Sequence, residues 1–429
     1  MLKLLPHNRI IRFNISILIF SFILIFGSAY RYLRLYNADL NNVPYILEIV
    51  LAIIVIIKLL HTRLITINRI DLLFLVLLIS ICISFFILSI RFGLSTQVPF
   101  VATYLLPISI YYYVRYNSIV TTRVIHLCLC IFVLVSFIFL SLEFFTVNYI
   151  GIPIFPFASH WDSVGVEGYH ASKQFYAMLG LKVRPWGLMA MPQASGTVFA
   201  SLFIYFLSKH FKTAAAQRTK LDFLFITVSF LGVFISGSRT AYVIMVILIL
   251  ILFRKRNAVI FLPVIVIALS LGIFLLSASS TSLLGFKVVI PATIQGFTIN
   301  SFYRLIDFIF GQGLNTVVGR EIIGVSEIHI LNHFFTAGAI IYFIMISIFF
   351  IIYYKYKSII LKYNLMYTIQ NRHYFYAFFF FIFSLIIGSL HYDALFRYPS
   401  NVIILAMIGL ISREISNFKH LKYQTNQNL

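Results

Sequence analysis

The chain has 429 residues, of which 61% are hydrophobic and 10% are charged, and its formal net charge is +21. This composition excludes a soluble globular domain, in which about 45–50% of residues are apolar and about 25% are charged. The basic residues stand in short clusters between apolar runs, a pattern that membrane topology explains and that gives no support to nucleic-acid binding.

Apolar runs that approach the ~20 residues needed to cross a hydrocarbon core recur along the whole chain. They predict an all-α, polytopic transmembrane helix bundle of about twelve spans, organised as a single transmembrane domain over residues 1–429. The predicted spans lie near residues 12–30, 44–61, 71–90, 99–114, 124–145, 187–208, 221–236, 240–253, 258–276, 331–354, 374–391 and 400–412.

Most of the 33 lysines and arginines fall in one alternate set of connections, beginning with Lys3, Arg9 and Arg12. By the positive-inside rule these connections face the cytoplasm, so both termini are predicted to be cytoplasmic and the other connections external. The first apolar run ends in Gly27-Ser28-Ala29, which would also suit a cleaved signal peptide. We expect a retained first helix, because it keeps the predicted topology in phase.

Two external connections are long, at residues 146–186 and 277–330. Loops of this length are uncommon unless they are functional or disordered, and these contain too many apolar residues for disorder. We therefore predict two folded external loops. In the second, Phe302, Leu305, Ile306 and Ile309 have helical spacing, which predicts a short helix at the membrane surface.

Arg239 lies in a Ser-Gly-Ser-Arg-Thr-Ala turn between two apolar runs. Placing an arginine near mid-depth in a bilayer costs a few kcal/mol, and an arginine within or at the boundary of a membrane usually has an anionic partner. Arg239 is therefore a candidate binding residue. The alternative is an arginine that closes a tight external turn and reaches the headgroups.

Arg184 and Trp186 lie where the first long loop returns to the membrane, in Arg184-Pro185-Trp186-Gly187. Proline and glycine here predict a broken approach, which is tolerated where backbone is buried in protein or lines a wet cavity. Arg184 would stand at its mouth. The alternative is an interfacial Arg/Trp anchor.

The second long loop ends in Glu327, His329 and His333. The two histidines are spaced i, i+4 and would share a helix face, but no His-Glu-x-x-His pattern accompanies them, so we predict no metal site. Proton transfer or a hydrogen bond to an anion suits them better, and a structural role is the alternative.

Two further features bear on the chemistry. His391, Asp393 and Arg397 near the last external turn either close the bundle by pairing with one another or join the site. The chain also lacks an Asp-x-Asp pair, a Walker loop and a nucleophile elbow. An external face of arginines, histidines and aromatic residues then suits an amphipathic, phosphate-bearing substrate met by guanidinium groups rather than by a metal.

Together these motifs resemble the bacterial O-antigen polymerase (Wzy-type) and O-antigen ligase superfamily. The resemblance is carried by the Ser236–Ala241 turn, by Arg184–Gly187 leading to Pro192, by Tyr303-Arg304 leading to Gly311-Gln312-Gly313, and by Glu327-x-His329 leading to Gly338. The ligases have a histidine followed directly by Asn, Ser or Gln, whereas here Ile330 follows His329. The resemblance therefore favours a polymerase.

The resemblance implies a GT-C-like membrane glycosyltransferase of the bacterial inner membrane, with its active site facing the periplasm. It would join undecaprenyl-pyrophosphate-linked oligosaccharides without a metal or other cofactor, and a chain-length regulator is a candidate protein partner. Its implied pyrophosphate- and substrate-binding residues are Arg184, Arg239, Arg304, Arg320, His333 and Trp186. His329 or Glu327 is the candidate base, and Arg239 completes the implied catalytic set.

Two other functions stay open at this point. One is an O-antigen ligase, which transfers finished polysaccharide to the lipid A core. The other is a flippase or transporter, which also has about twelve spans. Against the transporter stand the two long external loops, the scarcity of mid-membrane charges and the missing Gly-x-x-x-Asp-Arg pattern at residues 60–66.

Overall fold

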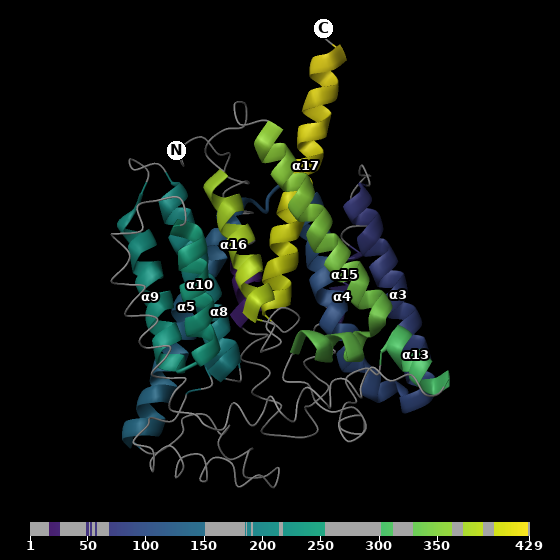
Figure 1. Ribbon diagram of the computed structural model, residues 1–429, viewed down its shortest axis with the longest axis horizontal. Helices are drawn as coiled ribbons and strands as arrows, with labels where there is room; N and C mark the ends of the chain where they lie inside the picture. Colours follow the sequence, from purple (N-terminus) through teal and green to yellow (C-terminus); the bar gives the residue numbers. More distant parts are fainter. Residues whose placement is uncertain are drawn as a thin grey trace. The chain divides into compact units, whose positions relative to one another are not determined.

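The computed structural model of the chain is helical throughout its described regular structure, and no strand occurs among the described residues (Figure 1). The structure describes residues 17–25, 49–50, 52–53, 56–57, 68–150, 185, 187–189, 192–213, 218–253, 302–311, 329–362, 372–388 and 399–427. The prediction of an all-α chain is confirmed for these residues.

Nine of the predicted spans coincide with the helices given below, helical residues at 17–25 and at 49–50, 52–53 and 56–57 fall within two more, and the predicted span 258–276 lies outside the described residues. The principal described helices are α3 (Arg69–Phe92), α4 (Leu94–Tyr116), α5 (Thr122–Phe145), α8 (Pro192–Lys212), α9 (Lys220–Ser236), α10 (Arg239–Phe253), α13 (Phe302–Phe310), α15 (His329–Lys362), α16 (Arg372–Gly388) and α17 (Ser400–Gln427). A π-helical turn, η3 (Thr146–Ile150), follows α5, and a 3₁₀ turn, η4 (Gly187–Met189), precedes α8.

Three described helical segments are long and apolar enough to cross a membrane: Arg69–Arg91, Thr122–Ile150 and Ala337–Lys355. Two shorter apolar helices are Thr240–Leu250 and His373–Gly388. Large apolar side chains on α3 and α9 are exposed, as expected of faces that contact lipid rather than water. The chain is thus a helical membrane protein by length and composition, while the twelve spans and the GT-C-like arrangement stay predictions.

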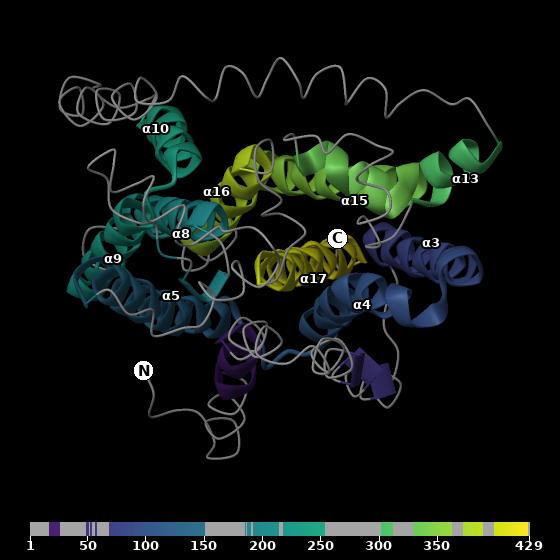
Figure 2. The same ribbon diagram turned by 90° about the horizontal axis from the view of Figure 1, so that it is seen from below.

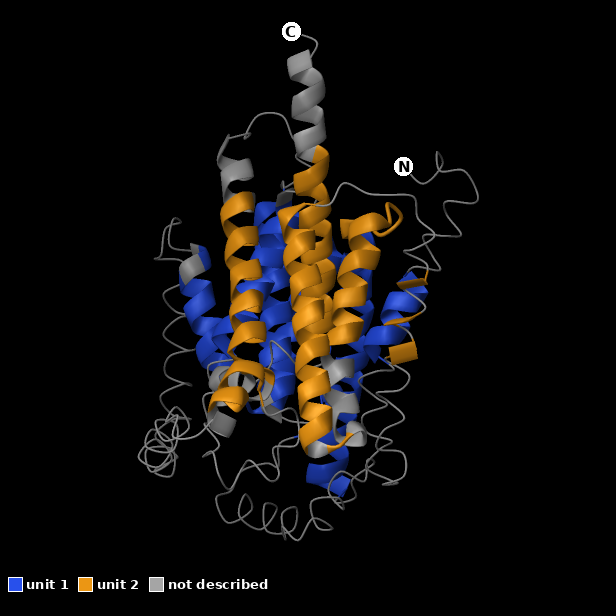
Figure 3. Cartoon of the chain, turned by 90° about the vertical axis from the view of Figure 1, so that its right-hand side faces the viewer, with its two compact units in different colours: residues 1–44, 123–279, 370–400 blue, residues 45–122, 280–369, 401–429 orange. Residues whose placement is uncertain are grey.

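The chain divides into two compact units, each assembled from separate stretches of sequence (Figure 3). Unit 1 comprises residues 1–44, 123–279 and 370–400, and unit 2 comprises residues 45–122, 280–369 and 401–429. The division does not test the predicted single transmembrane domain.

Unit 1 is built around α8, which packs against α9, α10 and α16 (Figure 2). Tyr205 of α8 stacks on Phe378 of α16 with a centroid distance of 5.8 Å, and Phe206 stacks on Phe225 of α9 at 5.3 Å. The Tyr205 hydroxyl lies 3.1 Å from Nδ1 of His126 on α5. Aromatic packing on α8 therefore joins helices that are distant in sequence.

A buried ion pair joins α8 to α9 one helical turn after Tyr205. The Lys209 Nζ donates to Oδ1 of Asp222 at 2.6 Å, and both side chains are less than 10% exposed. Asp222 also closes a capping box with Thr219, so α9 begins where its carboxylate meets the lysine. A buried cation and a buried anion compensate each other's desolvation only when they are paired in this way.

In unit 2, α3 packs against α4 and α15, and α13 packs against α15. The apolar segment of α17, residues 402–411, is buried along its whole length. A Cβ at Gly409 would lie 2.7 Å from the Tyr111 carbonyl oxygen and 3.2 Å from Cβ of Val114. Glycine is therefore required for α17 to approach the backbone of α4.

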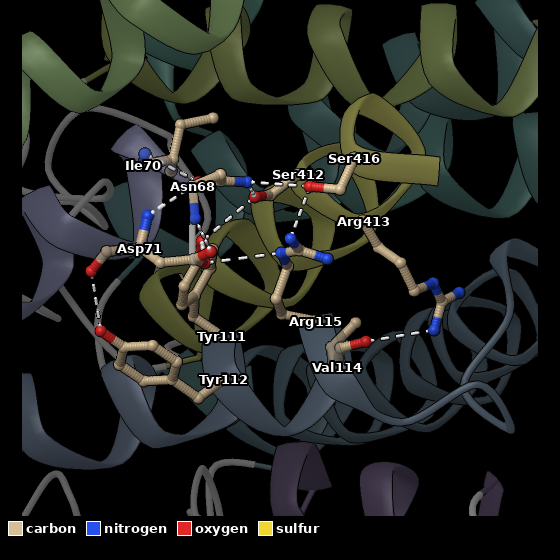
Figure 4. A network of polar contacts seen from close by, with 10 residues as sticks. All are labelled: Asn68, Ile70, Asp71, Tyr111, Tyr112, Val114, Arg115, Ser412, Arg413 and Ser416. Atoms are coloured by element: carbon tan, nitrogen blue, oxygen red, sulfur yellow. Dashed lines mark hydrogen bonds and ion pairs between the residues drawn. The ribbon is translucent and has the colours of Figure 1, made fainter. Parts of the chain in front are cut away.

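A polar network fastens α3, α4 and α17 together inside unit 2 (Figure 4). Asn68 caps α3 by accepting from the Ile70 and Asp71 amides, and its Nδ2 donates to the hydroxyls of Ser412 and Ser416 at 3.0 and 3.1 Å. These bonds join the start of α3 to α17.

Asp71 is the anion of this network. Its Oδ1 accepts from the Tyr111 hydroxyl at 2.6 Å and lies 3.4 Å from Nε of Arg115, whose Nη2 donates to Ser416. The Asp71 side chain is 1% exposed and that of Arg115 is 5% exposed. The charge of each is therefore compensated within the protein.

Arg413 of α17 binds backbone carbonyls at and beyond the C-terminal end of the neighbouring helix α4. Its guanidinium donates to the carbonyls of Val114, Asn117 and Val120, at 3.1, 2.5 and 2.6 Å. Val114 and Asn117 lie at the end of α4, where carbonyls have no partner within the helix, and Val120 lies in the connection to α5. A single cation from α17 therefore binds the end of α4 and the connection that follows it.

Replacement of Arg115 by alanine should destabilise unit 2, because it leaves the buried Asp71 carboxylate without its cation. The expected loss is about 3–5 kcal/mol in the free energy of unfolding. A denaturant titration of the purified protein in detergent measures it. Arg69→Ala is the control, since Arg69 is exposed at the first position of α3. Equal stability of the two variants would show that the Asp71–Arg115 pair contributes little.

Candidate functional site

The predicted site residues fall into two groups. Four lie on described helices, although their side chains are outside the described part: Arg239, Arg304, His329 and His333. The other four lie outside the described residues altogether: Arg184, Trp186, Arg320 and Glu327. The assignment of these eight residues to a site stays a prediction, and the structure describes the backbone that surrounds several of them.

Arg239 is the first residue of α10, directly after a tight turn. Helix α9 ends at Ser236, and Gly237 adopts a left-handed conformation with φ 60° and ψ 20°. Ser238 precedes α10 and accepts from the Ala241 amide at 3.4 Å, as an N-terminal cap does. The Ser-Gly-Ser sequence therefore reverses the chain and places Arg239 at the positive end of a helix.

The turn is buried and packs on α8. Ser236 and Ser238 are 0% and 1% exposed. A Cβ at Gly196 of α8 would lie 2.7 Å from Ser236 Oγ and 3.0 Å from Ser238 Oγ, and it would collide with Cβ of Ser238. A glycine at position 196 therefore allows the turn to lie directly against α8.

Gly187, the last residue of the Arg184–Gly187 motif, lies at the same end of α8. Gly187 begins η4 with φ 59°, and a Cβ there would lie 3.0 Å from Oγ of Ser195 and 2.7 Å from Cδ1 of Leu140. The Gly187 amide donates to Oε2 of Glu143 at 2.7 Å, and Glu143 is 5% exposed. Gly187 is thus held between α5 and α8.

Two motifs that are separate in the sequence therefore meet in unit 1. Gly187 approaches Ser195, and the Ser236–Ser238 turn approaches Gly196. Ser195 and Gly196 are adjacent residues in the first turns of α8. The end of α16 lies one residue further along, because a Cβ at Gly388 would collide with Cγ2 of Thr197. The predicted topology places all these helix ends on the external side.

A second group of motifs meets in unit 2, at a kink in α15. Gly338 interrupts this helix with φ 83° and ψ 162°, and Figure 1 shows the change of direction there. A Cβ at Gly338 would lie 2.5 Å from the Ile309 carbonyl oxygen and would collide with the Gly311 backbone. The end of α13 therefore packs on the kink, and the segment that carries His329 and His333 precedes it.

The predicted short helix at Phe302–Phe310 is confirmed as α13. Asp307 of α13 forms an ion pair with Arg91 in the last turn of α3, and the side chains are 16% and 23% exposed. Asp307 also accepts the Gly311 amide through its backbone carbonyl at 2.9 Å. The helix that carries Arg304 is thus fastened both to α3 and to α15.

Chemically, the two units share one feature. Arg239 begins α10 and His329 begins α15, so each cationic or titratable side chain is attached where a helix presents unpaired amides. Such positions favour anions such as phosphate. No group of three or more His, Cys, Asp and Glu residues that could hold a metal ion occurs in the described ranges.

Sequence reasoning missed several contacts that shape these clusters. Neither the hydrogen bond between Gly187 and Glu143 nor the ion pair between Arg91 and Asp307 was predicted from the sequence. Gly196 could have been noticed in the sequence, because a glycine within a helix often marks a close approach of another segment. The sequence does not show which segment approaches it.

No protein-family model, curated protein or solved structure matches the chain.

Replacement of Gly196 by alanine should loosen the turn before Arg239, because the new methyl group needs the space of Ser238. Overpacking of this kind costs about 1–3 kcal/mol. Hydrogen–deuterium exchange of the purified protein should show faster exchange of the amides at residues 237–241.

Gly232→Ala is the matched control. Gly232 is a buried helical glycine of the same unit, and its added methyl group would meet the Phe199 ring, with Cε1 at 2.6 Å. It should destabilise the protein to a similar degree and leave exchange at residues 237–241 unchanged. The same exchange in both variants would show that Gly196 does not set the position of the turn.

Proposed function

We propose that this chain is a polysaccharide polymerase of the bacterial inner membrane, which joins undecaprenyl-pyrophosphate-linked oligosaccharide units at the periplasmic face. The observation that carries the proposal is the meeting of the two arginine motifs on α8. The segments that end in Gly187 and begin at Ser236 pack on the adjacent residues Ser195 and Gly196. Arg184 and Arg239 are close in sequence to these two contacts.

Support also comes from unit 2, where two other stretches of the resemblance meet. Helix α13 carries Arg304 and packs on α15, which begins at His329. The contact at Gly338 joins the Gly311 end of the first stretch to the second. Each unit thus pairs stretches that the resemblance assigns to one site, although they are far apart in the chain.

The proposed reaction is a glycosyl transfer. The bond between C1 of the growing chain's first sugar and the pyrophosphate oxygen breaks, and a bond from C1 to a hydroxyl oxygen of the incoming lipid-linked unit forms. The proton of that hydroxyl goes to His329 or Glu327 as general base. The leaving group is undecaprenyl pyrophosphate.

Arginine suits the stabilisation of this leaving group. A guanidinium binds two phosphate oxygens through parallel hydrogen bonds and stays charged in an apolar environment. Preorganised cations in a site of low dielectric constant stabilise charge that develops in the transition state, without needing to reorganise. Arg239 and Arg184 take this role in the proposal, with Arg304 or Arg320 assisting and His333 binding substrate.

The membrane supplies the remaining requirement, because the substrate carries a long prenyl chain. Apolar side chains on α3 and α9 are exposed, and in this proposal they face the bilayer, which also holds the substrate's tail. Aromatic residues of the loops, including Trp186, would stack on sugar rings.

Deletion of the gene should change the lipopolysaccharide of the source bacterium in one defined way. A polymerase deletion leaves core that carries a single repeat unit, because one unit is still ligated but none is joined to the next. Gel electrophoresis of extracted lipopolysaccharide distinguishes this from bare core, which would instead assign the chain as the ligase. An unchanged ladder would exclude both.

Arg239→Ala should abolish chain elongation while the protein still accumulates in the membrane. Arg239→Lys should restore it only in part, because an ammonium group replaces a bidentate fork. The measurements are the lipopolysaccharide ladder and an immunoblot of the membrane fraction. Arg69→Ala is a matched control, since Arg69 is likewise the first residue of its helix but is predicted to face the cytoplasm. Normal chains from Arg239→Ala would remove this residue from the mechanism.

A further inference from the structure

Glu143 is a buried carboxylate near the external end of α5. It is 5% exposed, and its Oε2 accepts the backbone amide of Gly187 at 2.7 Å across 44 residues of sequence. A buried amide that loses its acceptor is left without a partner and keeps its full desolvation cost.

The position of this bond along the chain gives it a specific consequence. Helix α5 ends at Phe145, and the π-helical turn Thr146–Ile150 leads into the first long loop. The loop returns to the bundle at Gly187, where η4 begins. The Glu143–Gly187 hydrogen bond therefore joins the two ends of the loop at its base.

The donor side of the bond, at Gly187, is equally specific. Gly187 has φ 59°, a conformation that favours glycine, and a side chain there would press on Leu140 and Ser195. Its neighbour Leu188 is 2% exposed. The backbone at Gly187 is therefore held between α5, which supplies the carboxylate and Leu140, and α8, which supplies Ser195.

We propose that Glu143 is a positioning residue for glycosyl transfer, which fixes the backbone at Gly187, where the chain meets α5 and α8 after the first long loop. The proposal rests on the proposed function. Glu143 acts through the Gly187 amide, three residues after Arg184 and one after Trp186. Displacement of a binding group by about 1 Å can lower a rate by roughly a hundredfold.

Two substitutions of similar size separate the hydrogen bond from the volume of the side chain. Glu143→Gln keeps an acceptor oxygen, whereas Glu143→Met fills the space without one. Thr146→Val is the control, because the Thr146 hydroxyl is buried nearby and bonds to the carbonyls of Leu142 and Glu143 in its own segment. Immunoblots of the membrane fraction establish that each variant accumulates, and Glu143→Ala replaces Glu143→Met if the latter does not.

The first readout measures position without any assumption about the reaction. Leu188→Cys, in a background where Cys82, Cys128 and Cys130 are alanine, is treated in intact cells with a maleimide that does not cross the inner membrane. Loss of the hydrogen bond should raise the labelling rate roughly tenfold in Glu143→Met, as expected when a buried amide loses its partner. Labelling in Glu143→Gln and Thr146→Val should stay low, and low labelling in Glu143→Met would overturn the proposed clamp.

The second readout is the distribution of polysaccharide chain lengths. Glu143→Met should lose long chains, while Glu143→Gln should restore them, since it keeps the acceptor. If Glu143→Met shows the raised labelling rate but still makes polysaccharide chains of normal length, the positioning role is overturned and only a structural clamp remains. Equal loss in Glu143→Gln and Glu143→Met would overturn it too, because the charge rather than the acceptor would then be needed.

The two readouts also separate this inference from the proposed function. If gene deletion leaves the lipopolysaccharide unchanged, the proposed function fails and the positioning role fails with it. The labelling rates still decide whether Glu143 clamps the loop. If deletion gives the single-repeat phenotype and Glu143→Met behaves as the parent in both readouts, only the Glu143 inference fails.

Discussion

The need to compensate every buried charge is the constraint on which the described structure depends. Removing a carboxylate or a guanidinium from water costs several kcal/mol, which a partner of opposite charge and additional hydrogen bonds must offset. Asp71 and Arg115 meet this need in unit 2, and Lys209 and Asp222 meet it in unit 1. Because the partners lie on different helices, each pair also determines which helices are neighbours.

The same constraint explains where these pairs lie. Asp71 and Asp222 stand in the first turns of α3 and α9, where a carboxylate also caps the helix by accepting the amide of Asn68 or Thr219. One side chain thus satisfies a helix end and a cation from a neighbouring helix. Both elements begin near the predicted cytoplasmic side, so helix registration and topology depend on the same residues.

At the opposite, predicted external end, close backbone approach joins segments in addition to the Arg91–Asp307 ion pair. Gly196 receives the Ser236–Ser238 turn, and Gly338 receives the end of α13. Glycine has no Cβ, so segments can meet at distances that any other residue would prevent. This arrangement leaves the external ends of the helices to hold turns and loops close together. Of the residues proposed for catalysis, Arg239 directly follows one such turn.

The sequence by itself determined the class of protein and the positions of most helices. Apolar runs of the length that a membrane demands have few other interpretations, and α13 was predicted from four apolar residues at helical spacing. The sequence also singled out the Ser236–Ala241 turn and the Arg184–Gly187 segment, because arginine, proline and glycine are conspicuous against an apolar background.

What each motif contacts could not be predicted, since spacing along the chain gives no information about contacts between distant segments. Only the tertiary structure decided that Glu143 meets Gly187, that Gly196 meets Ser238 and that Arg115 meets Asp71. Each contact depends on helix packing, in which side-chain volume and the cost of burying charge select one arrangement from many that share the same hydrophobic pattern.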